Sequence, residues 1–322
     1  FNELFRYFKP TFDFKKLMEA VKRIVKNLNR VIDVNFYPVI ETKRSNLKHR
    51  PLGIGVQGLA DVFARFRYSF DSDEAQQLNK AIFAAICYAG CERGMKIARE
   101  RERPMNELKK QLRGTEIPEL YSKTCLKHSR GTKLYHQLKV SRCELERDEF
   151  LGSYSSFKGS PVSQGKFQVD LWEEEPIRQV NDIVLGWDSL REDIIKYGFR
   201  NSLLLAPMPT ASTSQILGNN ECIEPFTSNI YSRSTLAGQF IVLNKFLQKD
   251  LIEIGLWDSD VKDQIILNNG SIQSLTKLPK IIRDLYKISW DLSMKSLIDM
   301  AADRGIYVCQ SQSLNLWMEE PT

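Results

Sequence analysis

Apolar residues recur at three- and four-residue steps along several stretches of this chain, which is the spacing of one helix face. The first stretch runs from Phe12 to Ile32, and Asp13 or Thr11 can cap its start. A second predicted helix opens at Asp71 or Ser72 and ends near Arg99. Further helices are predicted over 187–197, 243–256, 259–267 and 280–304. The residues expected to face inward are Leu17, Val21, Ile24, Leu28 and Val31 in the first helix, and Trp187, Leu190, Ile194 and Ile195 in the third.

Short apolar runs between these helices predict buried strands. Phe199 to Ala206 follows Gly198, a suitable helix C-cap, and Gly305 to Cys309 follows the last helix. The segment from Asn35 to His49 has no clear period and is expected to be irregular. Helices interspersed with short strands favour an α/β fold, in which ligands collect at the carboxyl ends of the strands.

A cluster of hydroxyl residues follows the strand that ends at Ala206. Pro207 and Pro209 stiffen the turn, and Thr210-Ala-Ser-Thr-Ser214 then opens a short helix. The first turn of a helix leaves backbone N–H groups without partners, so this turn can bind an anion such as phosphate. An ordinary N-cap after a strand has the same composition. The local sequence does not decide between these two readings.

A literal G-x-G-x-x-G occurs at Gly53, Gly55 and Gly58, which raises the alternative of a nicotinamide-dinucleotide-dependent dehydrogenase. A dinucleotide fingerprint needs a hydrophobic strand directly before it, and the polar residues 45–51 do not provide one. The sequence is better interpreted as a glycine-rich strand that other backbone approaches closely, followed by a helix from Leu59.

The composition changes near Arg99, and residues 103–150 are rich in Lys and Arg with little apolar periodicity. We predict a basic, loosely structured insertion here, and binding of nucleic acid by it is the non-enzymatic alternative for this chain. Cys125, His128, His136 and Cys143 lie within it, but their spacing fits no usual zinc site, and no metal site is expected. Cys87 and Cys91, four residues apart on a predicted helix, are expected to be packed thiols.

The overall composition is that of a soluble globular protein. The chain has 322 residues, a net charge of +6 and 6 cysteines without framework spacing, which indicates reduced, cytosolic thiols. No window is apolar enough to span a membrane, and the start at Phe1 is not a secretory signal. Because the chain does not begin with Met, we expect it to be part of a longer protein.

Six strings in the same order carry a family signature, and together they cover nearly all of the chain outside residues 103–150. They resemble the large, catalytic subunit of class I ribonucleotide reductase (ribonucleoside-diphosphate reductase), most closely the eukaryotic type. The strings are Arg50-Pro-Leu-Gly-Ile-Gly-Val-Gln-Gly-Leu-Ala-Asp61, Gly159-Ser-Pro-Val-Ser163, Trp187-x-x-Leu190 with Gly198-Phe-Arg-Asn201, Ala206-Pro-Met-Pro-Thr-Ala-Ser-Thr213, Gly218-Asn-Asn-Glu-Cys-Ile-Glu-Pro225 and Gln310-Ser-Gln-Ser-Leu-Asn315.

The resemblance implies that residues 1–322 are part of the ten-stranded α/β barrel of the reductase, with 103–150 as a lineage-specific loop or a translated intron. It implies reduction of ribonucleoside diphosphates to deoxyribonucleoside diphosphates by thiyl-radical chemistry, for DNA synthesis in the cytoplasm. The residues that match the family's substrate-diphosphate site are Thr210, Ala211, Ser212 and Thr213. The implied partners are a small subunit with a di-iron radical centre, a thioredoxin-type reductant, ATP and deoxynucleotide effectors, and further large subunits in a homodimer or higher oligomer.

The resemblance places the chemistry itself outside these residues. Asn220, Cys222 and Glu224 have the spacing of the family's Asn-Leu-Cys-x-Glu radical centre, but their context matches a different family segment. We therefore assign no catalytic residue and no directly bound cofactor to this chain. The radical centre is expected before Phe1, and the radical-relay tyrosines and C-terminal redox cysteines after Thr322; the effector sites and N-terminal cone are expected elsewhere in the complete protein.

Overall fold

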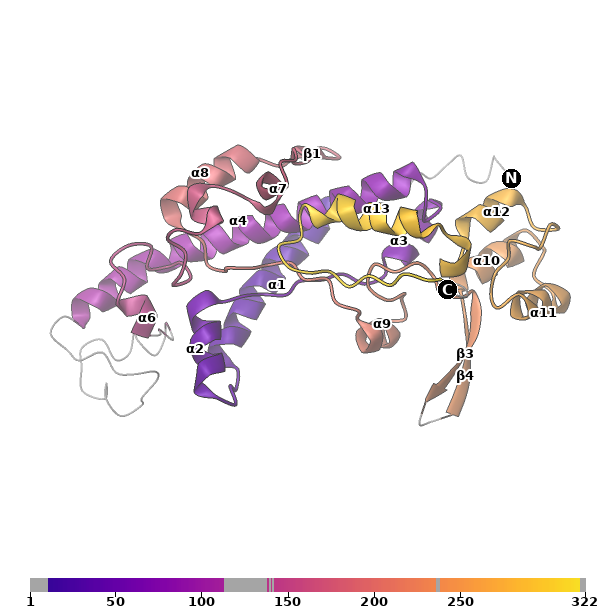
Figure 1. Ribbon diagram of the computed structural model, residues 1–322, viewed down its shortest axis with the longest axis horizontal. Coiled ribbons are helices and arrows are strands. Elements are labelled where there is room, and N and C mark those ends of the chain that lie inside the picture. The colour runs from indigo at the N-terminus through magenta and orange to yellow at the C-terminus, as the bar shows by residue number, and fades with distance from the viewer. Residues whose placement is uncertain (1–10, 113–137, 139, 141, 236–237, 319–322) are drawn as a thin grey trace.

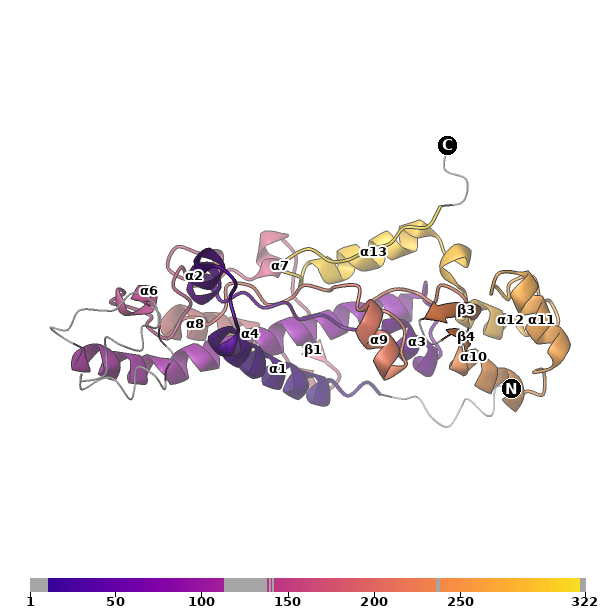
Figure 2. The ribbon, with the colours of Figure 1, turned by 90° about the horizontal axis from the view of Figure 1, so that it is seen from below.

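One long helix, α4 (Asp73–Gln111), runs through most of the length of the molecule (Figure 1). The computed structural model describes residues 11–112, 138, 140, 142–235 and 238–318. Helix α1 (Phe14–Val34) lies beside α4 in both ribbon views (Figures 1 and 2), and its start is capped by the Asp13 side chain, which accepts from Lys16 N at 2.9 Å. Within the described ranges the other helical elements are α2 (Ile40–His49), α3 (Leu59–Phe66), α6 (Arg142–Leu145), α7 (Gln168–Leu171), α8 (Trp187–Tyr197), α9 (Ala211–Leu217), α10 (Lys245–Glu253), α11 (Ser259–Leu267), α12 (Lys280–Leu285) and α13 (Met294–Gly305), with 3₁₀ turns η1 (Pro161–Gln164) and η2 (Ser289–Asp291).

The strands of the described residues form two antiparallel hairpins and one isolated parallel bridge. The hairpins are β1 (Gln179–Val180) with β2 (Ile183–Val184), and β3 (Ile230–Thr235) with β4 (Gly238–Leu243). The bridge joins Ile54 to Leu205. The α/β class is confirmed, but no closed barrel is formed by the residues that the structure describes.

The main core lies between α1, α4 and the segments packed on them, and a second cluster joins α10, α11 and α12. The buried residues of α1 are Phe14, Met18, Val21, Val25, Asn29 and Ile32. The predicted inward face was therefore wrong in part, since Ile24 is 41% and Val31 is 50% exposed. The predicted face and the buried face of α1 both carry apolar residues. Which of them is buried depends on packing against α4 and on the buried contacts of Asn29.

Four other expectations are corrected. Residues 40–49 form α2, although the region was expected to be irregular; Leu47 is its one buried residue, so it shows little periodicity. The predicted helix over 280–304 is broken after α12, where Ser289 N donates to Phe226 O at 2.8 Å and the Tyr286 carbonyl accepts from Asn229. Residues 305–309 end α13 and turn instead of forming a strand. Ile195 of α8 is 45% exposed, whereas Trp187, Leu190 and Ile194 are buried as predicted, and Gly198 is the C-cap.

Helix α4 continues well past Arg99, where its end was expected. Met105 and Leu108 are fully buried there and pack with Leu145 and Leu151, which follow about forty residues later in the sequence. The ends of the predicted insertion are thus ordered against each other. Its looseness at residues 113–137, 139 and 141 stays a prediction, since these lie outside the described residues, as do Cys125, His128, His136 and the side chain of Cys143.

Candidate functional site

The strand before the hydroxyl cluster is held by two neighbours. On one side Ile54 N donates to Leu204 O at 2.8 Å and Ala206 N donates to Ile54 O at 2.9 Å. On the other side the Cys309 sulfur accepts from Leu204 N at 3.1 Å and from Leu205 N at 3.3 Å. Leu204 and Leu205 are themselves buried. The predicted strand is therefore reduced to a single β-bridge at Leu205, and this hydrogen-bonded segment delivers the chain to the start of α9.

The turn into α9 has an unusual backbone. Thr210 precedes the helix with φ of 58°, in the left-handed region that β-branched residues rarely occupy. Its side chain does not cap α9; its oxygen accepts instead from Cys222 N at 2.8 Å. Cys222 also has a positive φ, of 38°. One hydrogen bond thus joins two strained residues, and because the Thr210 hydroxyl accepts it, its own proton stays available for a ligand.

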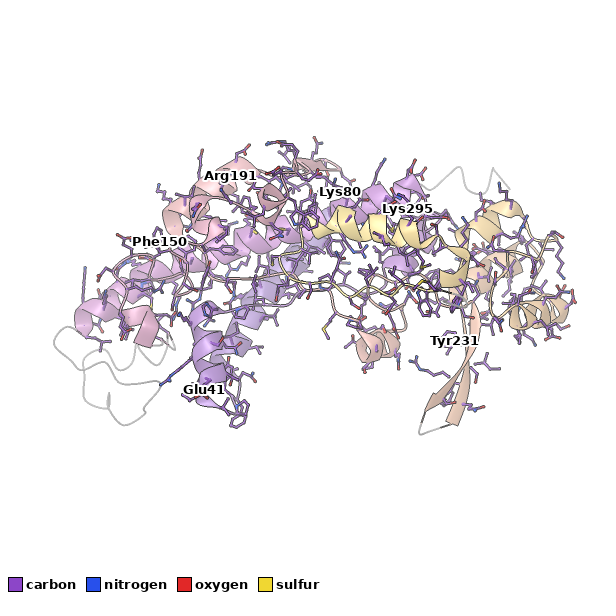
Figure 3. All side chains as sticks on the ribbon, in the orientation of Figure 1. Glu41, Lys80, Phe150, Arg191, Tyr231 and Lys295 are labelled. Carbon is purple, nitrogen blue, oxygen red and sulfur yellow. The ribbon has the colours of Figure 1, made fainter. Side chains whose placement is uncertain are left out.

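The first turn of α9 presents donors to solvent. Ala211, Ser212 and Thr213 are exposed, and within the described residues their backbone N–H groups make no hydrogen bond. Ser214 is buried and its hydroxyl donates back to Ala211 O, so it does not belong to this exposed group. Figure 1 shows α9 projecting from the body on the same side as the hairpin β3–β4, and Figure 3 labels Tyr231 on that hairpin. The four predicted residues are therefore together, with unpaired donors turned outward.

The loop that follows α9 folds back under the site. Asp61 of α3 accepts from Asn220 N at 2.6 Å and lies 3.8 Å from the Lys245 ammonium. Burial raises the pKa of the Asp61 carboxyl. The Asn220 amide donates to the carbonyls of Glu224 and Pro225 at 2.6 and 3.2 Å, which fixes the turn at Pro225. These acids and amides hold the backbone of the loop.

Cys222 is fully buried, and burial raises the pKa of its thiol to about 11. Beside it, burial also raises the pKa of Glu224, which is 8% exposed, and lowers the pKa of Arg304 to about 10. A thiol that is protonated and shielded from solvent is poorly suited to nucleophilic chemistry. That the radical centre lies outside this chain stays a prediction from the sequence context of Cys222.

The glycine-rich segment does not offer a dinucleotide site. Gly58 N donates to Asn220 O at 2.9 Å and Leu59 N to Cys222 O at 3.4 Å, so the start of α3 is covered by the loop after α9. A Cβ on Gly55 would lie 3.2 Å from Pro207 Cα. The segment is closely approached by other backbone, as predicted, and the pyrophosphate position of a dinucleotide fold is filled by protein.

The structure also shows where the paired cysteines of α4 lie and whether any group of side chains could bind a metal ion. Cys87 and Cys91 are 7% and 6% exposed in the core, as predicted. Among the described residues no group of three or more His, Cys, Asp or Glu side chains could hold a metal ion. Across the same residues no helix has the length and apolar character needed to cross a membrane.

Nothing in the sequence indicated Gln57, whose amide contacts Thr213 and Asn219, because a separation of 156 residues from Thr213 leaves no local signal.

Comparison with known proteins shows the family to which this chain is similar. Residues 3–322 match the family model described as ribonucleotide reductase, barrel domain. The chain is 46% identical over 319 residues to the ribonucleoside-diphosphate reductase large subunit of Caenorhabditis elegans, covering 98% of this chain and 34% of the relative. It is 44% identical over 312 residues to large chain 2 of the same enzyme from Saccharomyces cerevisiae, covering 97% of this chain and 30% of the relative. It therefore spans about a third of the length of these relatives.

A solved structure supports the fold. The Actinobacillus ureae class Id ribonucleotide reductase alpha subunit aligns with 97% of this chain and 42% of its own, with a TM-score of 0.55 and 23% sequence identity. At this identity the likeness concerns the fold alone. It agrees with the barrel-domain match over nearly the whole chain.

Proposed function

Because this chain belongs to the ribonucleotide reductase family through its barrel domain, we propose that Thr210, Ala211, Ser212 and Thr213 bind the diphosphate of a ribonucleoside diphosphate. The observation that carries the proposal is the exposed start of α9, where three backbone N–H groups have no partner among the described residues. Phosphate oxygens are acceptors only, so they match a turn made of N–H and hydroxyl donors.

The loop is prepared for this role before any ligand arrives. The left-handed φ of Thr210 turns the backbone so that the following N–H groups share one exposed side, and the bond from Cys222 N holds that turn. A rigid set of donors loses little conformational entropy on binding, which favours affinity. Neutral donors also suit a site that must release its product, because a buried ammonium or guanidinium would hold a phosphate more tightly.

For the complete protein we propose the reaction of a ribonucleoside-diphosphate reductase, in which the 2′-hydroxyl of the ribose is replaced by hydrogen in thiyl-radical chemistry. This chain contributes the anchor for the diphosphate. The radical cysteine and reducing cysteines are proposed to lie in other parts of the complete protein, because the sequence context of Cys222 differs from that of the family's radical centre. A small subunit with a di-iron radical centre, a thioredoxin-type reductant, ATP and deoxynucleotide effectors, assembly of large subunits and a cytoplasmic location belong to the same proposal.

The test is titration of the 322-residue chain with ADP, followed by ³¹P NMR of the two phosphates. We expect both resonances to shift on binding and inorganic pyrophosphate to compete. Thr213→Val and Ser212→Ala should each weaken binding by about tenfold, since a hydrogen bond to a charged group is worth roughly 1.5 kcal/mol or more.

Thr276→Val and Ser293→Ala are matched controls, because both residues are exposed and lie in other turns of the chain. They should leave ADP binding unchanged. The proposal is overturned if ADP does not bind, or if the control variants weaken binding as much as the loop variants.

A further inference from the structure

The side chain of Gln57 connects the two ends of α9. Thr213 Oγ1 donates to Gln57 Oε1 at 2.9 Å, and Gln57 Nε2 donates to Asn219 Oδ1 at 3.1 Å. Thr213 lies in the first turn of α9, and Asn219 directly follows its C-cap, Gly218. Gln57 comes from the distant glycine-rich segment and is half-buried. A single amide therefore ties the exposed hydroxyl of the proposed site to the body of the protein.

The neighbouring glycine makes this contact sterically possible. Gly58 has φ of 78°, and a Cβ at this position would lie 3.3 Å from both the Cβ and the Nδ2 of Asn219. Gly58 N also donates to Asn220 O at 2.9 Å. The backbone at Gly58 thus lies against the loop after α9, which places Gln57 at a fixed distance from Thr213.

The direction of these hydrogen bonds matters for a phosphate. The Thr213 hydroxyl has one proton, and in the structure that proton is directed to Gln57 Oε1, with Thr210 O 3.3 Å away as a second acceptor. A phosphate oxygen can only accept, so the hydroxyl must turn its proton outward to bind it. A carboxamide can support both arrangements, because half a turn about its last bond replaces the acceptor with a donor.

We propose that Gln57 is a positioning residue for the diphosphate site, acting with Asn219 as a pair of amides that hold Thr213 Oγ1 and release its proton to the ligand. With both amides turned, Gln57 Nε2 donates to Thr213 Oγ1 and Asn219 Nδ2 donates to Gln57 Oε1. The Thr213 proton then points to the phosphate, while Thr213 Oγ1 and Gln57 Oε1 each accept a hydrogen bond from an amide N–H. This inference rests on the proposed function of the loop and extends it to a residue far away in the sequence.

The experiment uses the 322-residue chain and ADP, with binding followed by the ³¹P resonances. Gln57→Met removes the hydrogen bonds to Thr213 Oγ1 and Asn219 Oδ1, together with a long one of 3.5 Å to Thr213 O, with little change in volume. It should weaken ADP binding about fivefold, the effect of one neutral hydrogen bond. Gln57→Glu should weaken it further, because a carboxylate accepts the Thr213 proton, cannot donate it back and repels the phosphate.

Two comparisons separate positioning from a general loss of structure. Gln273→Met is the matched control, since Gln273 is also half-buried and its amide donates to Arg283 O at 2.7 Å. It should lower the melting temperature about as much as Gln57→Met does and leave ADP binding unchanged. In the Thr213→Val background, Gln57→Met should cause no further loss, because the hydroxyl through which it acts is gone.

The outcomes distinguish the inference from the proposal beneath it. If the unmodified chain does not bind ADP, the diphosphate site itself is wrong. If Thr213→Val weakens binding but Gln57→Met and Gln57→Glu do not, or if Gln57→Met weakens binding equally with and without the Thr213 hydroxyl, the site stands and the positioning role of Gln57 is refuted.

Discussion

Replacement of Glu144, a buried carboxylate, should strongly lower the free energy of unfolding of this protein. It lies in α6, at the ordered end of the predicted insertion, and is 1% exposed. Its Oε1 accepts from Arg200 Nη1 at 2.8 Å and from Arg101 Nη2 at 3.3 Å. Arg200 is also 1% exposed and directly precedes the strand that leads to the proposed site. Glu144→Ala is therefore expected to destabilise both the insertion and that strand.

The magnitude follows from the charges that would remain. Burial lowers the pKa of Arg200, and the nearby Arg50 and Arg101 guanidinium groups lower it further, with Glu144 as the opposing charge. Without Glu144, the partners that Arg200 Nη1 keeps among the described residues are the carbonyls of Gly152 and Ser153, each at 3.2 Å. Removing one partner of a buried ion pair costs about 3–5 kcal/mol. We expect the upper end for Glu144→Ala and about 3 kcal/mol for Glu144→Gln, which keeps an acceptor oxygen.

The assay is urea unfolding followed by circular dichroism. Asp148→Asn is the matched control: it removes one carboxylate from the same segment, but the Asp148 side chain is 95% exposed, so its pair with Lys109 should contribute little to stability. If Glu144→Gln and Asp148→Asn lower the free energy of unfolding by the same amount, Glu144 does not neutralise a buried charge and the reasoning fails.

Two further predictions concern the approach to the site and the start of α4. Gly58→Ala should lower the free energy of unfolding by about 1–2 kcal/mol in urea titrations, because alanine is strained at the left-handed φ of this position and its Cβ would press against Asn219; unchanged stability would contradict the structure. The unmodified chain should show no NAD binding by fluorescence, and binding of NAD would contradict the filled position at Gly58. Burial alone would raise the pKa of Asp71, but hydrogen bonds from Lys287 and Ser69 lower it below its usual value. The Asp71 carboxylate therefore stabilises the fold at pH values above the unfolded pKa, and this stabilisation is lost as the pH falls through the folded pKa. Asp71→Asn should thus cost up to about 1 kcal/mol at pH 7 and progressively less as the pH falls through the folded pKa, and a loss that does not change with pH would rule out the ion pair as its cause.

The sequence predicts local elements well where one face of a helix is buried and its ends carry ordinary caps. Helix α8 has the predicted bounds, with Gly198 as its C-cap, and α1 begins after Asp13. The four residues of the proposed diphosphate site lie together because they are contiguous in the sequence, and Ala211, Ser212 and Thr213 are exposed. Their role stays a proposal, since no ligand contact tests it.

Features that depend on distant contacts were not predictable. The buried face of α1 is set by α4 and by the contact of Asn29 with Asn201, 172 residues away. The break after α12 depends on Phe226 and Asn229, whose polar groups bond to the backbone at 286–289. One signal was available and not used: Met105, Leu108 and Leu112 keep the helical spacing through Pro104, and all three are buried.

The segment after α13 stands beside the strand 203–206 without forming a backbone ladder. The Cys309 sulfur and the Gln310 amide take the place of main-chain groups, with Gln310 Nε2 donating to Leu52 O at 2.7 Å and to Leu205 O at 3.2 Å. A main-chain ladder tolerates almost any side chain, whereas this junction depends on the side chains of two particular residues, Cys309 and Gln310. Substitution of Cys309 or Gln310 should therefore loosen the segment that leads to the proposed site, although neither residue belongs to that site.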